Sequence, residues 1–222
     1  DIRLFPFANL DDQEERRRYV VDDHSEILST GGLSFFADDA IRRDLGYASD
    51  RWLAEDLGLT LYTPRRALPD AEDPHCDVES LKQAVLPAVF GELTLDNRQG
   101  TKPRRAFFGL GANPSDPRMR ELYGPLSDGL AGFALGREMM VCGRADDWES
   151  RQYFSIWDIG GRQGAAYGHC GLGSTGLIQF TVGPGQCETR RFVLVFYKEG
   201  PVTTGMEGRY FYTRFFDRIE SA

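Results

Sequence analysis

Ala88-Val-Phe-Gly-Glu-Leu-Thr-Leu95, Asp96-Asn-Arg-Gln-Gly100 and Arg104-Arg-Ala-Phe-Phe-Gly-Leu110 follow one another and decide the fold class of this chain. The first and third segments have the composition of β-strands. The middle segment is a turn rich in residues that tolerate positive φ. We therefore predict a β-hairpin over residues 88–110.

Strand patterns continue on both sides of this stretch. Leu57-Gly-Leu-Thr-Leu-Tyr-Thr63 alternates apolar with small or polar residues, which is typical of a half-buried strand. The other predicted strands are residues 2–7, further strands within 41–63, and residues 132–136, 138–142, 151–157, 176–182 and 190–197. One short helix is predicted to begin after Asp77, which can cap it, and to end before Pro87. Together with 25 glycines and 11 prolines, this pattern predicts a mainly β chain. We expect a large antiparallel β-sandwich of the supersandwich type with one or two short helices.

The last residues, Gly208-Arg-Tyr-Phe-Tyr-Thr-Arg-Phe-Phe-Asp-Arg-Ile-Glu-Ser-Ala222, predict an aromatic strand that runs into the first turn of a helix. We expect the chain to be a domain of a longer protein that continues beyond this point. The predicted strand has no fully polar face, so we expect it to pack against a following domain. The candidate interface residues are Arg209, Tyr210, Tyr212 and Arg214.

Composition excludes several classes of partner. The net charge is -8 and there is no basic stripe, so we expect neither nucleic acid nor an anionic membrane as a partner. No apolar run reaches the roughly 20 residues of a membrane-spanning helix. The four cysteines, at 76, 142, 170 and 187, form no CxxC pair and favour free thiols in a reducing compartment. On that ground we expect a cytoplasmic location.

No cofactor or metal is expected. Gly171-Leu-Gly-Ser-Thr-Gly176 matches a dinucleotide-binding pattern, but a strand pattern follows it where that motif needs a helix. The pairs His75-Cys76 and His169-Cys170 have the wrong spacing for tetrahedral zinc. The three histidines have no GxSxG elbow beside them, so a serine or cysteine hydrolase is not indicated. Nothing among the 34 Asp and Glu residues marks a catalytic pair.

Nine segments, in order along the chain, carry a resemblance to a known family. They are Leu4-Phe-Pro-Phe7, Ile41-Arg-Arg-Asp44, Ala48-Ser-Asp-Arg-Trp-Leu-Ala-Glu-Asp-Leu-Gly-Leu-Thr-Leu-Tyr-Thr-Pro64, Leu68-Pro-Asp70, Leu81-Lys-Gln-Ala-Val-Leu-Pro-Ala-Val89, Glu92-Leu-Thr-Leu-Asp-Asn97, Arg104-Arg-Ala-Phe-Phe-Gly109, Val202-Thr-Thr-Gly-Met206 and Tyr210-Phe-Tyr-Thr-Arg-Phe-Phe216. The chain resembles the N-terminal region of glycoside hydrolase family 52, the β-xylosidase family. Residues 111–185 match only loosely.

The resemblance implies an N-terminal β-sandwich followed by a barrel of paired helices in a retaining enzyme. Both catalytic carboxyl groups of such enzymes lie in the helical barrel, so the resemblance places no catalytic residue in this chain. Residues 1–222 are then expected to be a single non-catalytic sandwich domain, inactive alone, that supports the helical catalytic domain. It could also shape the rim of the active site or a homodimer contact. The implied ligand of the parent protein is xylose or a xylo-oligosaccharide.

Two alternatives from other classes stay open. A stand-alone carbohydrate-binding module would show exposed, coplanar aromatic side chains and affinity for xylose or xylo-oligomers. An oligomerisation or assembly module would change size with protein concentration.

Overall fold

Two β-sheets of unequal size make up the core of the molecule. The computed structural model describes residues 2–5, 33–70, 72–112, 118–122, 128–153, 159, 175–203 and 207–222, and structural statements below concern these residues. The predictions made for His24, His169 and Cys170, for residues 6–7 and 154–157 of two predicted strands, and for residues 171–174 of the glycine-rich motif lie outside them. The mainly β sandwich that the sequence predicts is confirmed.

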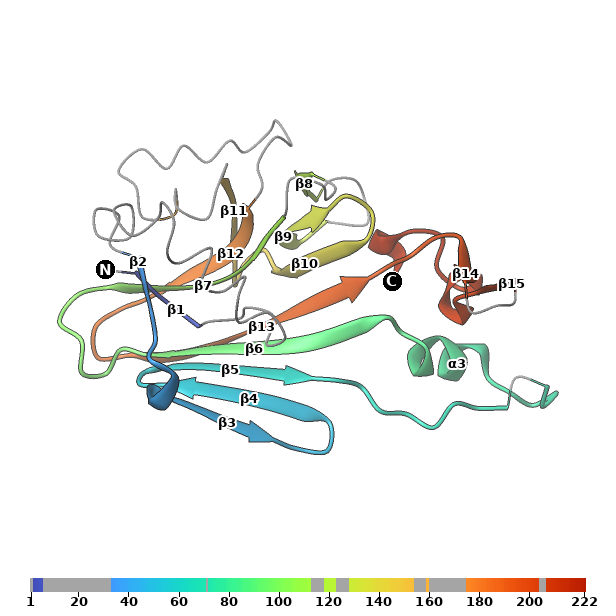
Figure 1. Cartoon of the computed structure of the whole chain (residues 1–222), viewed down its shortest axis with the longest axis horizontal. Helices are drawn as coiled ribbons and strands as arrows, with labels where there is room; N and C mark the ends of the chain where they lie inside the picture. Colours follow the sequence, from blue (N-terminus) through green and yellow to red (C-terminus); the bar gives the residue numbers. More distant parts are fainter. Residues whose placement is uncertain are drawn as a thin grey trace.

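The larger sheet has eight antiparallel strands (Figure 1). In spatial order they are β3 (Ile41–Leu45), β4 (Ser49–Ala54), β5 (Leu57–Tyr62), β6 (Ala88–Asp96), β13 (Cys187–Phe196), β10 (Met139–Arg144), β9 (Leu130–Leu135) and β8 (Met119–Glu121). The smaller sheet runs in the order β11 (Glu149–Tyr153), β12 (Thr175–Val182) and β7 (Arg104–Gly111). The main hydrophobic core draws buried side chains from both sheets, among them Leu93, Phe133 and Ile178. This is the arrangement of a sandwich, whose inner faces pack together.

Smaller elements surround the sandwich. Strand β1 (Ile2–Leu4) pairs in parallel with β2 (Leu33–Phe35), and β14 (Pro201–Thr203) pairs with β15 (Glu207–Arg209). Short 3-10 helices in the described residues include η1 (Asp38–Ala40), η4 (Phe211–Arg214) and η5 (Ile219–Ser221). The predicted helix is confirmed as α3 (Val78–Ala84). Its N-cap is Asp77, whose side chain accepts the backbone N–H groups of Glu79 and Ser80.

The predicted hairpin over residues 88–110 is wrong in its pairing, although both strands exist. Strand β6 pairs with β5 and β13 in the large sheet, and β7 pairs with β12 in the small one. The connection between β6 and β7 therefore crosses from one sheet to the other. The turn after β12, residues 183–186, crosses back in the same way. The pairs β6–β13 and β7–β12 therefore join strands that lie far apart in the sequence.

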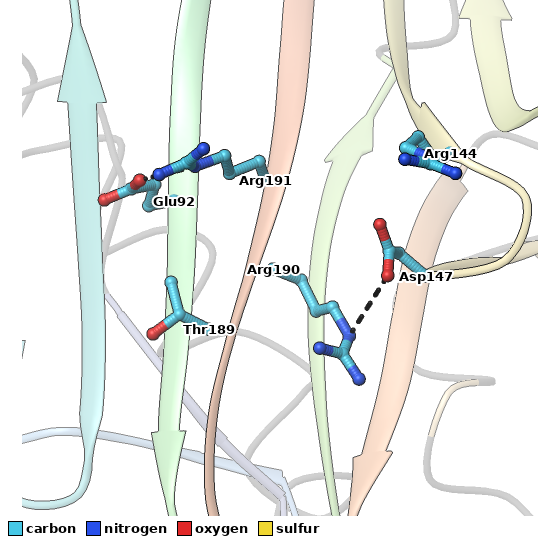
Figure 2. Close-up of a pocket in the computed structure, with 6 residues that line it drawn as sticks. All are labelled: Glu92, Arg144, Asp147, Thr189, Arg190 and Arg191. Carbon is cyan, nitrogen blue, oxygen red and sulfur yellow. Dashed lines mark hydrogen bonds and ion pairs between the residues drawn. The ribbon is translucent and has the colours of Figure 1, made fainter.

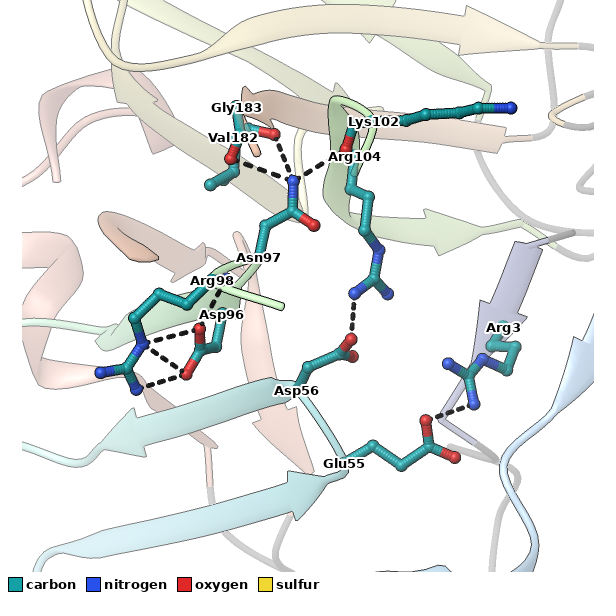
Figure 3. Close-up of polar contacts among 10 residues, drawn as sticks. All are labelled: Arg3, Glu55, Asp56, Asp96, Asn97, Arg98, Lys102, Arg104, Val182 and Gly183. Carbon is teal, nitrogen blue, oxygen red and sulfur yellow. Dashed lines mark hydrogen bonds and ion pairs between the residues drawn. The ribbon is translucent and has the colours of Figure 1, made fainter. Parts of the chain in front are cut away.

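Asn97 holds the two crossing connections together (Figure 3). Its side-chain amide nitrogen donates to the carbonyl oxygens of Lys102 (2.9 Å), Val182 (3.0 Å) and Gly183 (3.0 Å). The side chain is fully buried, at 0% exposure. Since an amide nitrogen carries two hydrogens, three such contacts use all of its donor capacity.

An ion pair joins the sheets at the same end. Asp56, in the turn between β4 and β5, pairs with Arg104 at the start of β7 (Figure 3). Beside it, Glu55 adopts a positive φ of 50° and pairs with Arg3 of β1. Asn97 and the two ion pairs therefore fasten β1, the large sheet and the small sheet to one another.

The predicted terminal strand, which was to include Arg209 to Tyr212, is wrong beyond Arg209. Strand β15 ends at Arg209, and the chain then forms the 3-10 helix η4. The hydroxyl and the backbone N–H of Thr213 both bond the carbonyl of Tyr210. These local bonds compete with a sheet ladder, as Thr side chains often do. The predicted helical turn after the aromatic run exists as the 3-10 helix η5.

Candidate domain interface and an adjoining hollow

The four candidate interface residues follow one another on β15 and η4 but differ in exposure. Arg209 and Arg214 are exposed, and Arg214 lies over the ring of Phe211 at 5.4 Å. Tyr210 is 39% exposed and stacks on Tyr212, with ring centroids 5.3 Å apart and an angle of 16° between the rings. Arg209, Tyr210 and Arg214 can therefore meet a partner with their side chains.

Tyr212 has a different position, because it packs inward. Its ring lies 5.7 Å from that of Tyr197, and it contacts a buried cluster that includes Val195 and Ile219. Its hydroxyl accepts the backbone N–H of Lys198 at 2.9 Å. Tyr212 thus fastens the terminal segment to the outer face of the large sheet. Of the two stacked tyrosines, Tyr210 is the one whose side chain is exposed to a partner.

A partly buried ion pair completes that attachment. Arg120 of β8 pairs with Glu220 of η5, and its Nε also donates to the carbonyl oxygen of Gly136 at 2.7 Å. Burial by itself would raise the pKa of Glu220. Its hydrogen bonds, chiefly from Arg120, and the positive charges of Arg120 and Arg218 outweigh that effect and lower the pKa.

This ion pair predicts a pH-dependent contribution to stability. A carboxyl group with a lowered folded-state pKa stabilises the fold above its unfolded pKa, and the gain is lost as the pH falls through the folded value. We expect Glu220→Gln to lower the unfolding free energy by about 1 kcal/mol at pH 7 and by much less at pH 3. Urea unfolding of both proteins at the two pH values measures this. The exposed Glu79→Gln is the control, and an equal deficit of Glu220→Gln at both pH values would contradict the prediction.

Four exposed apolar side chains, which we call the apolar rim, belong to the end of β3, the β3–β4 turn, the loop after β5 and α3. The rim consists of Leu45, Tyr47, Leu68 and Val78. Tyr47, in the turn between β3 and β4, is 82% exposed although the guanidinium of Arg65 lies 4.4 Å from its ring centroid. The backbone N–H of Thr63 bonds the carbonyl of Ala48, which holds the loop after β5 beside that turn. Arg66 and Gln83 then link the loop to α3, where Val78 lies.

A hollow of about 380 Å³ opens where β13 and β10 separate. These strands pair only as far as Cys142 and Val193. The buried ring of Trp148 fills the inner part of the gap, and its Nε1 donates to the carbonyl oxygen of Arg191 at 2.7 Å. The hollow is lined by six polar or charged residues, which are Glu92, Arg144, Asp147, Thr189, Arg190 and Arg191 (Figure 2).

Comparison with known proteins identifies the family. Residues 1–222, the whole chain, match the model of glycosyl hydrolase family 52. This chain belongs to glycosyl hydrolase family 52. It is 35% identical over 218 residues to a beta-xylosidase of Geobacillus stearothermophilus, covering 98% of this chain and 30% of the relative. A second beta-xylosidase of the same organism is 32% identical over 228 residues, with 98% and 36% covered. The family-52 chain thus spans about a third of the length of the relatives it matches.

The carboxyl groups of this family-52 chain whose pKa values shift are Asp50, Asp77, Asp96 and Glu220, and within the described ranges each shifts downward. The hydrogen bonds from Arg98 to Asp96 lower its pKa to about 2 (Figure 3). A carboxylic general acid needs the opposite shift, which burial or a neighbouring carboxylate produces. These four groups are therefore suited to ion pairs and helix capping rather than to proton transfer near neutral pH.

The remaining candidate features of the family-52 chain are reactive thiols, clusters of metal ligands and membrane-spanning helices. Cys76, Cys142 and Cys187 are free thiols, and burial raises the pKa of Cys142 to about 11, which disfavours the reactive thiolate. Three or more potential metal ligands do not gather anywhere in the described part of the chain. The same part contains no helix whose length and hydropathy would let it cross a membrane.

The sequence did not single out the hollow. Glu92 and Asp147 come from a strand and from a turn that are 55 residues apart, and no motif connects them. Arg190-Arg191 is the one local signal, since two adjacent arginines within a predicted strand place one positive charge on each side of the sheet.

Proposed function

We propose that this chain is the non-catalytic β-sandwich part of a retaining β-xylosidase-like glycosyl hydrolase. In this role it supports a helical-barrel domain that carries both catalytic carboxyl groups, and it adds to the rim of the active site or to a dimer contact. The parent protein would act on xylosides or xylo-oligosaccharides, as the names of its relatives suggest. We also propose a cytoplasmic location, because a reducing compartment keeps its thiols free.

The apolar rim is the observation that carries this proposal. Leu45, Tyr47, Leu68 and Val78 are well exposed, while backbone hydrogen bonds hold the β3–β4 turn and α3, and Arg65 lies over the ring of Tyr47. Ordered, exposed apolar surface commonly marks a site of contact with another domain or protein. Tyr210 and its arginine neighbours provide a second, more polar contact area. Family membership and the share of the relatives that is covered support a domain that works together with another one.

A chimera tests the supporting role. The segment of the first Geobacillus relative that aligns with this chain would be replaced by this chain, and hydrolysis of an aryl β-xyloside would be measured. We expect the chimera to turn over the substrate and the isolated 222-residue chain to show no rate above the buffer blank. Clear turnover by the isolated chain would overturn the non-catalytic role.

The rim is tested within the same chimera. Tyr47→Ser combined with Leu68→Ser should lower its melting temperature or its activity while leaving the unfolding free energy of the isolated chain nearly unchanged. The matched control is Leu130→Ser, since Leu130 is exposed on β9 away from the rim. Equal effects of the rim and control substitutions would show that the rim is not the supporting contact.

A further inference from the structure

We propose that the hollow beside β13, together with the neighbouring outer face of β5 and β6, binds a neutral pyranose sugar or a short chain of such units. This proposal does not rest on the supporting role above. It rests on the charges that line the hollow, on the hydrogen-bonding capacity left at its walls and on two aromatic side chains at its edge.

The charges of the hollow are paired, which argues against an anionic ligand. Arg191 donates to Glu92 at 2.9 Å, and Arg144 lies 3.5 Å from Asp146. Arg190 pairs with Glu188 and lies 3.8 Å from Asp147 (Figure 2). Each guanidinium therefore has a carboxylate partner, so the site lacks the uncompensated positive charge with which proteins hold phosphate or sulfate.

The walls nevertheless have capacity for further hydrogen bonds. Glu92 accepts one bond at each carboxylate oxygen, from the hydroxyl of Tyr62 (2.9 Å) and from Arg191 (2.9 Å). A carboxylate can accept about four bonds, so roughly two acceptor positions remain. The gap of 3.8 Å between Asp147 and Arg190 is too long for a hydrogen bond, which leaves Asp147 able to accept a hydroxyl group. Each guanidinium–carboxylate pair, Glu92 with Arg191 and Asp147 with Arg190, can donate to and accept from hydroxyl groups of a sugar at the border of the hollow.

The carboxylate of Glu92 is held in place before any ligand binds. Tyr62 and Arg191 hold Glu92 from both sides. Thr94 and Thr189 share a hydrogen bond of 2.8 Å between their hydroxyl oxygens on the same face of the sheet. The buried Trp148 anchors the backbone of Arg191 from below. A site whose polar groups are already oriented loses less entropy on binding.

Two aromatic rings extend the hollow. Tyr62 of β5 and Phe90 of β6 are directly opposite in the sheet register, and both are partly exposed. Side chains opposite each other in antiparallel strands lie on one face, with Cβ atoms about 4.5–5.5 Å apart. Because Tyr62 also donates to Glu92, the aromatic pair adjoins the polar wall. An apolar surface beside a polar one matches a pyranose, which has a face of C–H bonds and an edge of hydroxyl groups.

Titration of the isotopically labelled 222-residue chain with xylotriose and with cellotriose tests this inference by NMR. We expect roughly millimolar affinity, as is usual for an open site of this kind, with shifts of the backbone amides at residues 92, 147 and 189–191. Glu92→Gln and Asp147→Asn should each weaken binding about tenfold, because each removes a charged acceptor. Phe90→Ala should also weaken binding while leaving these acceptors in place.

Controls make the outcome decisive. Glu79→Gln removes a carboxylate from the exposed face of α3 and should leave the affinity unchanged. Circular dichroism of each variant shows whether it is folded. If Glu92→Gln or Asp147→Asn does not fold, the comparison is made with Phe90→Ala. Absence of shifts at these amides, or equal affinity of the folded variants and the parent, would overturn the proposal. So would binding of inorganic phosphate to the hollow with an affinity similar to that of the sugars.

Discussion

Replacing Asn97 by aspartate is expected to lower the unfolding free energy by at least about 3 kcal/mol at pH 7. The substitution exchanges an amide nitrogen for a carboxylate oxygen that faces the carbonyl oxygens of Lys102, Val182 and Gly183. Oxygen facing oxygen in a fully buried site is repulsive, and the new carboxyl would respond with a raised folded-state pKa. A group with a raised pKa destabilises the fold above its unfolded pKa, so the loss should grow from pH 4 to pH 7.

Urea unfolding of both proteins at pH 4 and pH 7 measures this loss. Gln83→Glu introduces the same charge at an exposed position of α3 and should change stability by less than about 0.5 kcal/mol. If the variant does not fold, Asn97→Ala provides the comparison, since it removes the donors without adding a charge. A loss for Asn97→Asp no larger than that of the control would contradict the role given to the amide.

Trp148→Ala is expected to lower the unfolding free energy by about 3–5 kcal/mol. The ring is 4% exposed and meets Phe180 and Phe192 edge to face, at 5.1 Å and 5.8 Å between ring centroids. It also lies so close to Gly143 that a Cβ there would come within 2.2 Å of the ring. Removing the ring leaves a cavity between β10 and β13 and leaves the carbonyl of Arg191 without its donor.

Trp148→Phe separates these two effects, because it keeps much of the volume and removes only the N–H group. It should cost about 1 kcal/mol, the usual net contribution of one hydrogen bond. Chemical denaturation of both variants gives the two values, with the exposed Tyr47→Ala as the reference for loss of an aromatic ring. A similar cost for Trp148→Ala and Tyr47→Ala would contradict the packing described here.

The strands of this fold could be predicted from sequence far better than their partners. Apolar alternation and turn residues depend on a few neighbouring positions, and they located β5, β6, β7, β9, β10, β12 and β13. The partner of β6 depends on residues almost a hundred positions away, and no local pattern reports it. The turn after Asp96 favours a reversal of the chain, but a reversal serves equally for a hairpin and for a crossing between two sheets. Only the buried amide of Asn97 distinguishes the two, and burial of a polar side chain is not visible in sequence.

The candidate interface shows the same limit on a smaller scale. The density of aromatic residues in the terminal segment predicted packing against a following domain, which stays a prediction, and in the structure Tyr212 packs against a buried cluster of this chain. The sequence predicted a strand that contains both Tyr210 and Tyr212, whereas η4 begins after Tyr210, the two rings stack, and of the two Tyr210 is the exposed one. The hollow could not be predicted, since it exists because β10 diverges from β13, a result of three-dimensional packing around Trp148.

The central pair of the large sheet has a consequence for the synthesis of the protein. Glu92 of β6 and Arg191 of β13 face each other across this pair and are 99 residues apart in the sequence. At roughly 5–20 residues per second, a ribosome needs on the order of 5–20 s to produce that interval. During that time the newly made β6 has a pairing partner on one side only, and its other edge is open to strands of other nascent chains. Slower translation of residues 97–186 should therefore reduce the soluble yield, and a bound holdase chaperone should restore it.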